Sequence, residues 1–152
     1  MPESKMDVAH CLEISDEAPV LTEGVSMRPM LRQHRDVVII KKVDRPLKKH
    51  DVVAYDVPAR DKLVLHRIIK ITRDGKYIIR GDNTYRKEYG ITDKQIVGVM
   101  KAFYRNGKYC DPETSFKYKI YVFFMRLFYP ARFVWKCKLY PLLSKIKHTV
   151  IK

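Results

Sequence analysis

Residues 62–80, KLVLHRIIKITRDGKYIIR, carry the clearest structural signal in the chain. Residues 62–71 and 76–80 are short runs rich in isoleucine and valine, which is the composition of β-strands. Between them, Arg73-Asp74-Gly75-Lys76 contains the Asp-Gly pair that favours a tight hairpin turn. The segment therefore predicts an antiparallel β-hairpin.

Similar runs lie on both sides of this hairpin. Further strands are expected at residues 36–41 (DVVIIK), 51–57 (DVVAYDV), 96–104 (IVGVMKAFY) and 108–110 (KYC). Asn106-Gly107 is a second hairpin signal, of the type I′ kind. No helical periodicity of useful length occurs between residues 26 and 109, and only residues 3–14 predict a short helix before them. We therefore expect a mainly β fold of antiparallel sheets.

The composition changes near Asp111-Pro112, a turn-favouring pair. Residues 114–152 contain nine lysines and arginines, no acid, and ten of the seventeen aromatic residues. Residues 1–113 account for only +5 of the net charge of +14. We expect residues 1–113 to form the domain and residues 114–152 a basic, aromatic, helical tail. Pro130 and Pro141 should kink or end helices in that tail.

The tail is the part of the sequence that favours a membrane surface. Residues 116–129, FKYKIYVFFMRLFY, predict a helix with Lys119 and Arg126 on one face. Apolar and aromatic residues interleaved with lysine and arginine suit a helix lying among anionic lipid headgroups, so the tail from Phe116 is expected to bind there. The alternatives are that residues 120–128 pack on the β-core or that the helix binds a partner protein.

Several classes of function are disfavoured by composition. The chain has three cysteines without a CxxC or Cys/His pairing, so we expect no zinc site, disulfide framework or other cofactor. The first nineteen residues lack the apolar run of a signal peptide, and no stretch of eighteen apolar residues suggests a spanning helix. A peripheral membrane or cytoplasmic location is expected. The basic charge accompanies large aliphatic residues and no nucleic-acid-binding motif, so we expect no nucleic acid partner.

The first candidate for chemistry is Ser26, in the segment GVSMRPML at residues 24–31. The serine follows a short extended segment, and the Met-x-Pro after it places the hydroxyl on a constrained turn. A serine nucleophile needs such exposure, with its own backbone N–H facing the oxyanion. A turn or capping hydroxyl is the structural alternative.

The other candidates are one histidine and two acids. His66 interrupts an apolar strand, where a histidine is usually structural. Asp82 lies in the turn Arg80-Gly81-Asp82-Asn83, and Glu88 follows six residues later. An acid in such a turn either caps backbone N–H groups or orients a catalytic histidine.

Taken together, these segments resemble the type I signal peptidase family. The motifs that carry the resemblance occur in register over residues 20–105, and they are GVSMRPML, RQHRDVVII, LKKHDVVAY, LHRIIKI, YIIRGDN and IVGVM. His66 stands where the common bacterial branch and the self-cleaving repressors have lysine. The chain is therefore most similar to the serine–histidine branch found in the endoplasmic reticulum, archaea and some bacteria.

The resemblance implies a role for each candidate residue. Ser26 matches the family nucleophile, His66 the general base and Asp82 the acid of the Gly-Asp-Asn motif. Glu88 stands where the histidine branch has a further aspartate, its usual third catalytic residue, so either acid could complete the site. Gly24 replaces a serine of many bacterial members, which leaves the oxyanion hole to backbone N–H groups.

The implied function is a serine endopeptidase with a signal-peptidase fold of coiled antiparallel sheets. It would bind extended peptides or precursor proteins and cleave signal or leader segments after small residues, through an acyl-enzyme. Two alternatives are a soluble protease that matures a dedicated leader peptide, and a catalytically silent module that binds peptide or lipid.

Overall fold

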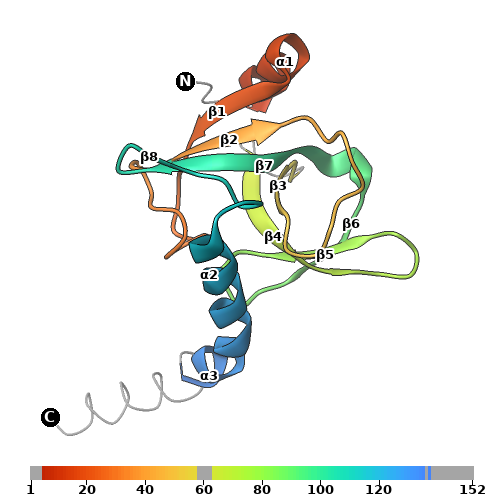
Figure 1. Cartoon of the computed structure of the whole chain (residues 1–152). Helices are drawn as coiled ribbons and strands as arrows, with labels where there is room; N and C mark the ends of the chain where they lie inside the picture. Colours follow the sequence, from red (N-terminus) through yellow and green to blue (C-terminus); the bar gives the residue numbers. More distant parts are fainter. Residues whose placement is uncertain (1–4, 58–62, 136, 138–152) are drawn as a thin grey trace, which may run out of the picture. The chain divides into compact units, whose positions relative to one another are not determined.

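The computed structural model describes residues 5–57, 63–135 and 137. The chain divides into two compact units, Met1–Ser115 and Phe116–Lys152. The first unit is built mainly from strands and the second from helices (Figure 1). The division follows shortly after the Asp111-Pro112 turn, where the charge and aromatic content of the sequence change.

The mainly β prediction is confirmed. The described part of the first unit contains, in chain order, α1 (Lys5–Ser15), β1 (Glu17–Leu21), β2 (Val37–Lys41), β3 (Val52–Tyr55), β4 (Val64–Ile71), β5 (Tyr77–Arg80), β6 (Glu88–Ile91), the short 3₁₀ helix η1 (Asp93–Gln95), β7 (Ile96–Arg105) and β8 (Lys108–Cys110). The predicted short N-terminal helix is present as α1. The predicted hairpin is β4–β5, and positive φ angles at Asn106 (51°) and Gly107 (73°) give the turn between β7 and β8 its type I′ character.

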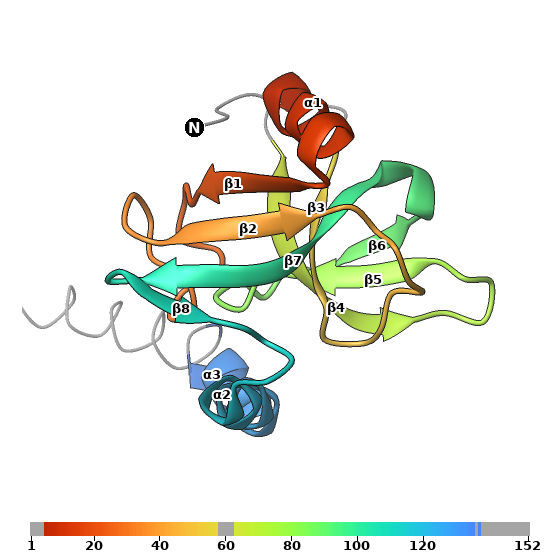
Figure 2. The same ribbon diagram turned by 45° about the horizontal axis from the view of Figure 1, so that its top comes forward.

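The strands form one antiparallel sheet in the order β1-β2-β7-β3-β4-β5-β6, with β8 paired to β7 (Figure 2). The long strand β7 therefore pairs with β2, β3 and β8. Its pairing shifts register between Ile39 and Ile40 and again between Ala54 and Tyr55. Such bulges increase twist and bend a sheet, which lets a single sheet enclose a core.

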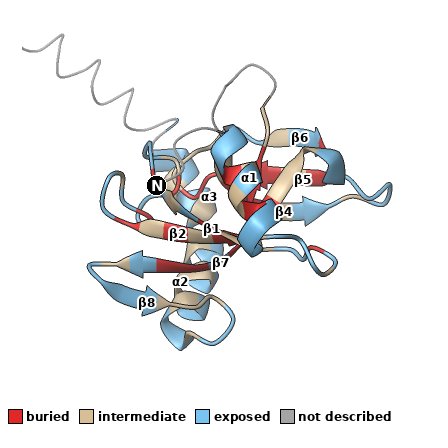
Figure 3. Cartoon of the chain, turned by 90° about the horizontal axis from the view of Figure 1, so that it is seen from above, coloured by how far each residue is buried: buried red, intermediate tan, exposed pale blue. Residues whose placement is uncertain are grey.

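A cluster of buried hydrophobic residues forms part of the core. Its buried members come from β3, β4, β5, β6 and β7 and from the loop before β3, and they are Leu47, Val53, Tyr55, Ile68, Tyr77, Ile79, Ile91 and Val99. Buried residues, red in Figure 3, lie mainly along the strands. Helix α1 packs on β1 and buries Val8 and Leu12. A Cβ atom at Gly98 would lie 2.5 Å from Ile40 Cγ2 and 2.7 Å from the Lys41 carbonyl oxygen, so the absent side chain lets β7 lie close against β2.

The second unit begins with two consecutive helices, α2 (Phe116–Leu127) and α3 (Tyr129–Val134). The single helix expected over residues 116–129 is thus interrupted at Phe128, and Pro130 lies in the first turn of α3, where its missing N–H costs no hydrogen bond. Pro141 lies outside the described residues. Each helix in the described ranges is too short or too polar to cross a lipid bilayer.

Candidate active site

Ser26 lies in the loop between β1 and β2, and polar contacts fix the base of this loop. The Thr22 hydroxyl donates to the carbonyl oxygens of Arg32 (2.8 Å) and Asp36 (2.9 Å). The Arg32 N–H donates to the carboxylate of Asp36 (2.9 Å), whose side chain is completely buried. These hydrogen bonds join the two ends of the loop, so Ser26 is held on a defined turn between them.

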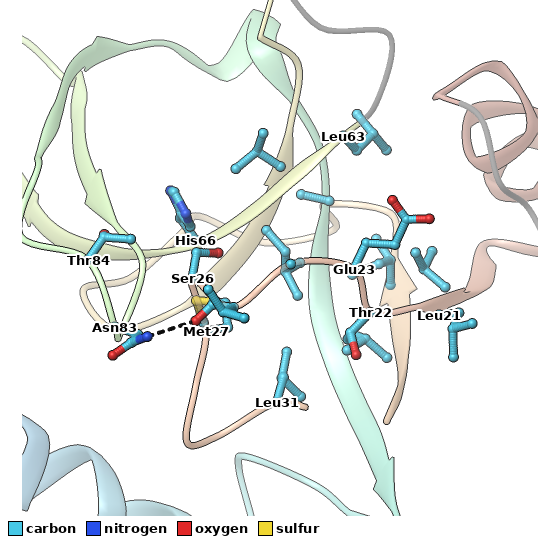
Figure 4. Close-up of a pocket in the computed structure, with 18 of the residues that line it drawn as sticks. Leu21, Thr22, Glu23, Ser26, Met27, Leu31, Leu63, His66, Asn83 and Thr84 are labelled. Atoms are coloured by element: carbon cyan, nitrogen blue, oxygen red, sulfur yellow. Dashed lines mark hydrogen bonds between the residues drawn. The ribbon is translucent and has the colours of Figure 1, made fainter. Parts of the chain in front are cut away.

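The turn after β5 holds the serine backbone from the other side. The Asn83 N–H donates to the Ser26 carbonyl oxygen (2.7 Å). The Asn83 side-chain amide donates to the Val25 carbonyl oxygen (3.1 Å), the dashed line in Figure 4. These two bonds connect the segments of the Ser-Met-x-Pro and Gly-Asp-Asn motifs, which are far apart in the sequence.

His66 is positioned by the register of β3 and β4. It lies opposite Val53, so its side chain shares a sheet face with Tyr55, two residues further along β3. The ring is nearly buried, and its Nδ1 atom lies 3.1 Å from Glu88 Oε1 and 3.1 Å from the Tyr55 hydroxyl. The Tyr55 hydroxyl also donates to Glu88 Oε2. An acid and a hydroxyl thus fix the orientation of the imidazole through the same nitrogen.

Gly81 brings the serine and the histidine together. A Cβ atom at this position would lie 2.6 Å from the Ser26 carbonyl oxygen and 2.9 Å from His66 Nε2, both shorter than real contacts. The absent side chain therefore makes room for both the imidazole and the serine backbone. Figure 4 shows the Ser26 side chain next to the His66 ring.

Asp82 lies in a different environment. Its carboxylate accepts two hydrogen bonds from Arg67, from Nε to Oδ1 (2.8 Å) and from Nη2 to Oδ2 (2.7 Å). Both side chains are buried, and Arg67 Nη1 also donates to the His50 carbonyl oxygen (2.9 Å). The paired, two-point geometry is the strong form of an Arg–carboxylate contact, and it connects β4 with the turn after β5.

Sheet register explains why the two acids go to different partners. Ile79 of β5 lies opposite both Ile68 of β4 and Glu88 of β6, so Glu88 shares the face of His66, which is two residues before Ile68. Arg67 lies opposite Arg80, and Asp82 follows Arg80 by two residues. Asp82 therefore lies in the turn just beyond the end of β5, where its carboxylate reaches Arg67.

A cavity of about 670 Å³ opens beside these residues. Ser26, His66 and Glu88 line it together with Glu23 and Arg86. Much of the remaining wall is apolar and comes from α1, the β1–β2 loop and strands β1–β4, including Val8, Val20, Leu31, Val38, Ile40, Leu63 and Leu65. In the described ranges, no group of three His, Cys, Asp or Glu side chains is arranged to hold a metal ion. The cavity therefore combines a polar end with an apolar wall, as in sites that bind organic ligands or peptides.

Two residues of this arrangement were not singled out by the sequence. Tyr55 was expected only as part of a strand, and Arg67 only as a neighbour of His66. The signal that connects them to the site is the pairing of β3 with β4 and of β4 with β5, which a single sequence does not reveal. Of the four predicted site residues, the structure places Ser26, His66 and Glu88 at one cavity and pairs Asp82 with Arg67.

No protein-family model matches this chain, and no curated protein shows a significant match to it. The membership in the signal peptidase family that the motifs indicate therefore stays a prediction.

Proposed function

We propose that this protein is a serine endopeptidase of the signal-peptidase type, with Ser26 as nucleophile, His66 as general base and Glu88 as the acid that orients the histidine. The observation that carries the proposal is the meeting of three sequence-distant groups. The Ser26 backbone and His66 Nε2 both pack against Gly81, and the other nitrogen of the same imidazole contacts Glu88. All three line one cavity.

The chemistry follows from the position of the imidazole. When the Nδ1–H of His66 is donated to the Glu88 carboxylate, Nε2 carries the lone pair and accepts the proton of the Ser26 hydroxyl. The Ser26 oxygen then attacks the scissile carbonyl, and His66 returns the proton to the leaving amine. Water, activated by the same nitrogen, hydrolyses the resulting acyl-enzyme. The Ser26 N–H is proposed as one donor to the oxyanion.

Asp82 has a separate role in this proposal. Its two hydrogen bonds to Arg67 keep the turn after β5 in place, and that turn carries both Gly81 and Asn83. Asp82 thus acts on the reaction only by positioning the residues on either side of it. We propose Glu88, rather than Asp82, as the third member of the site.

The proposed substrates are extended segments of peptides or precursor proteins, cleaved after small residues as in the family that the motifs resemble. The apolar cavity wall supports an apolar segment such as a signal or leader peptide. Because such segments are met at membranes, the proposal includes peripheral association with a membrane surface.

The test compares the wild-type chain with Ser26→Ala on a diverse peptide library, with the products identified by mass spectrometry. Ser115→Ala is the matched control, because it removes a hydroxyl of the same unit outside the cavity lining. Cleavage by wild type and Ser115→Ala but not by Ser26→Ala supports the proposal. Cleavage that survives in Ser26→Ala, or binding of library peptides without any cleavage, contradicts it, and the second result favours a silent binding module.

A further inference from the structure

Helix α2 presents a continuous apolar stripe to solvent. We use this name for Phe116, Ile120, Phe123, Phe124 and Leu127, which recur at the three- and four-residue spacing of one helix side. Their exposed fractions range from 39% at Ile120 to 74% at Phe116, and no residue of α2 is buried. Side chains of this size are normally the first to be covered in a soluble domain, so the apolar stripe requires a partner.

Aromatic rings widen this surface toward the next helix. Phe124 lies edge-on to Phe123, with ring centroids 5.6 Å apart, and stacks on Phe128 at 5.7 Å with an interplanar angle of 10°. The rings thus support one another within their own segment while remaining exposed. A surface that is already ordered in this way loses little conformational freedom when it is covered.

Charge identifies the kind of partner. Lys119 and Arg126 are seven residues apart and run along one edge of the apolar stripe, and Lys117 flanks its other edge. Residues 114–152 contain no acid at all. An apolar stripe bordered only by cations fits a surface that is apolar inside and anionic outside.

We propose that α2 binds the surface of an anionic lipid bilayer, with the apolar stripe among the acyl chains near the headgroups and Lys117, Lys119 and Arg126 at the level of the phosphates. At about 1.5 Å per residue, its 12 residues extend about 18 Å, which suits a helix in the plane of the membrane. This inference stands on the helix alone and does not depend on peptidase activity.

Two other partners fit the same helix less well. Nucleic acid would engage the cations and leave the apolar stripe exposed to water. A second copy of the chain would cover the apolar stripe but would bring the two sets of cations together without neutralising them. An anionic lipid surface satisfies both features at once, because its acyl chains cover the apolar stripe and its phosphates neutralise the cations.

The experiment is flotation of the full chain with vesicles of phosphatidylcholine alone and of phosphatidylcholine mixed with phosphatidylserine. Lys119→Gln combined with Arg126→Gln removes two cations beside the apolar stripe, and Lys48→Gln combined with Lys49→Gln removes two exposed cations from the sheet unit. Phe123→Gln is paired with Tyr109→Gln, an exposed aromatic residue of β8. Activity on a soluble peptide is measured in parallel for every variant.

The expected result is binding to the mixed vesicles, with partitioning lowered roughly 30-fold by the Lys119/Arg126 pair, from about 1 kcal/mol per cation. Phe123→Gln should lower it further, and both control variants should bind like wild type. An equal loss of partitioning in the Lys48/Lys49 variant would overturn the proposal, as would equal flotation with and without phosphatidylserine. So would absence of flotation together with dimer formation or nucleic acid binding. Peptidase activity without flotation would reject the membrane proposal alone, and flotation without activity would reject the peptidase proposal alone.

Discussion

Two neighbouring residues of β4, His66 and Arg67, organise two chemically different regions of the same sheet. The His66 ring contacts Glu88 and Tyr55 and lines the same cavity as Ser26. Arg67 is buried in a two-point pair with Asp82. Each region has one basic group and one acid, yet only the first lines the cavity. The difference teaches that alternation along a strand can separate a proposed catalytic pair from a structural ion pair by a single residue.

Replacing His66 should give the largest effect, a loss of activity without a comparable loss of stability. We expect His66→Ala to lower kcat/KM by a factor on the order of 10⁵, because the serine hydroxyl loses its proton acceptor. The melting temperature should change far less than it does for variants at Arg67. Peptide hydrolysis and thermal unfolding of the same preparation measure both effects. A variant that retains activity would remove His66 from the reaction.

Glu88→Gln should lower kcat by roughly 10³- to 10⁴-fold, since an amide in place of the carboxylate no longer fixes the imidazole in the productive tautomer. KM should change little because Glu88 acts on the histidine rather than on the peptide chain. Steady-state kinetics give both parameters. Asp82→Asn, assayed at a temperature where it is folded, is the matched control and should retain much more activity. If Asp82→Asn instead loses more activity than Glu88→Gln, Asp82 is the catalytic acid.

The Arg67–Asp82 pair should matter mainly for stability. Asp82→Ala leaves a buried guanidinium without its carboxylate, and breaking such a pair costs about 3–5 kcal/mol of unfolding free energy. Urea unfolding followed by circular dichroism measures the loss. Arg67→Met combined with Asp82→Leu should recover much of it, because no charge is then left buried. Equal instability of the single and double variants would argue against the pair as the cause.

The smallest expected effect is a pH dependence of folding stability caused by Tyr77, which belongs to the same core cluster as Tyr55. Burial, and then the hydrogen bond from its hydroxyl to Asp93 Oδ1 (2.7 Å), raise the pKa of Tyr77 to about 12 from its ordinary value of 10. Because the folded state holds the proton more tightly, this contribution to stability is complete below pH 10 and is lost between pH 10 and 12. Denaturant midpoints of wild type and Tyr77→Phe should therefore converge over that range. A constant difference would show that the phenol does not titrate there.

Much of the sheet could be predicted because most of its strands are short β-branched runs bounded by turn residues. β1 and β6 were not predicted as strands. β1 contains Pro19 and lies at the end of the sheet order, and β6 contains Gly90 and a charged residue, so neither has a local strand pattern. Their pairing with β2 and β5 supplies the hydrogen bonds that local propensity does not indicate.

The site was predicted as a set of residues but not as a geometry. Ser26, His66, Asp82 and Glu88 were all recognisable from motif spacing, whereas the choice of partner for each acid depends on register. The opposition of Ile79 to Glu88 determines that choice, and it arises from pairing between strands that the sequence separates by a loop. Tyr55 belongs to the same category, because only the pairing of β3 with β4 brings its hydroxyl to His66.

The three residues 81–83 connect segments that lie far apart in the sequence. Gly81 touches Ser26 and His66, Asp82 holds Arg67, and Asn83 holds the loop of Ser26. Opening of this one turn would release the proposed nucleophile and the proposed base together while leaving most of the sheet paired. Activity is therefore expected to fall as the turn opens and before the sheet unfolds, which would make catalysis a sensitive reporter of local unfolding.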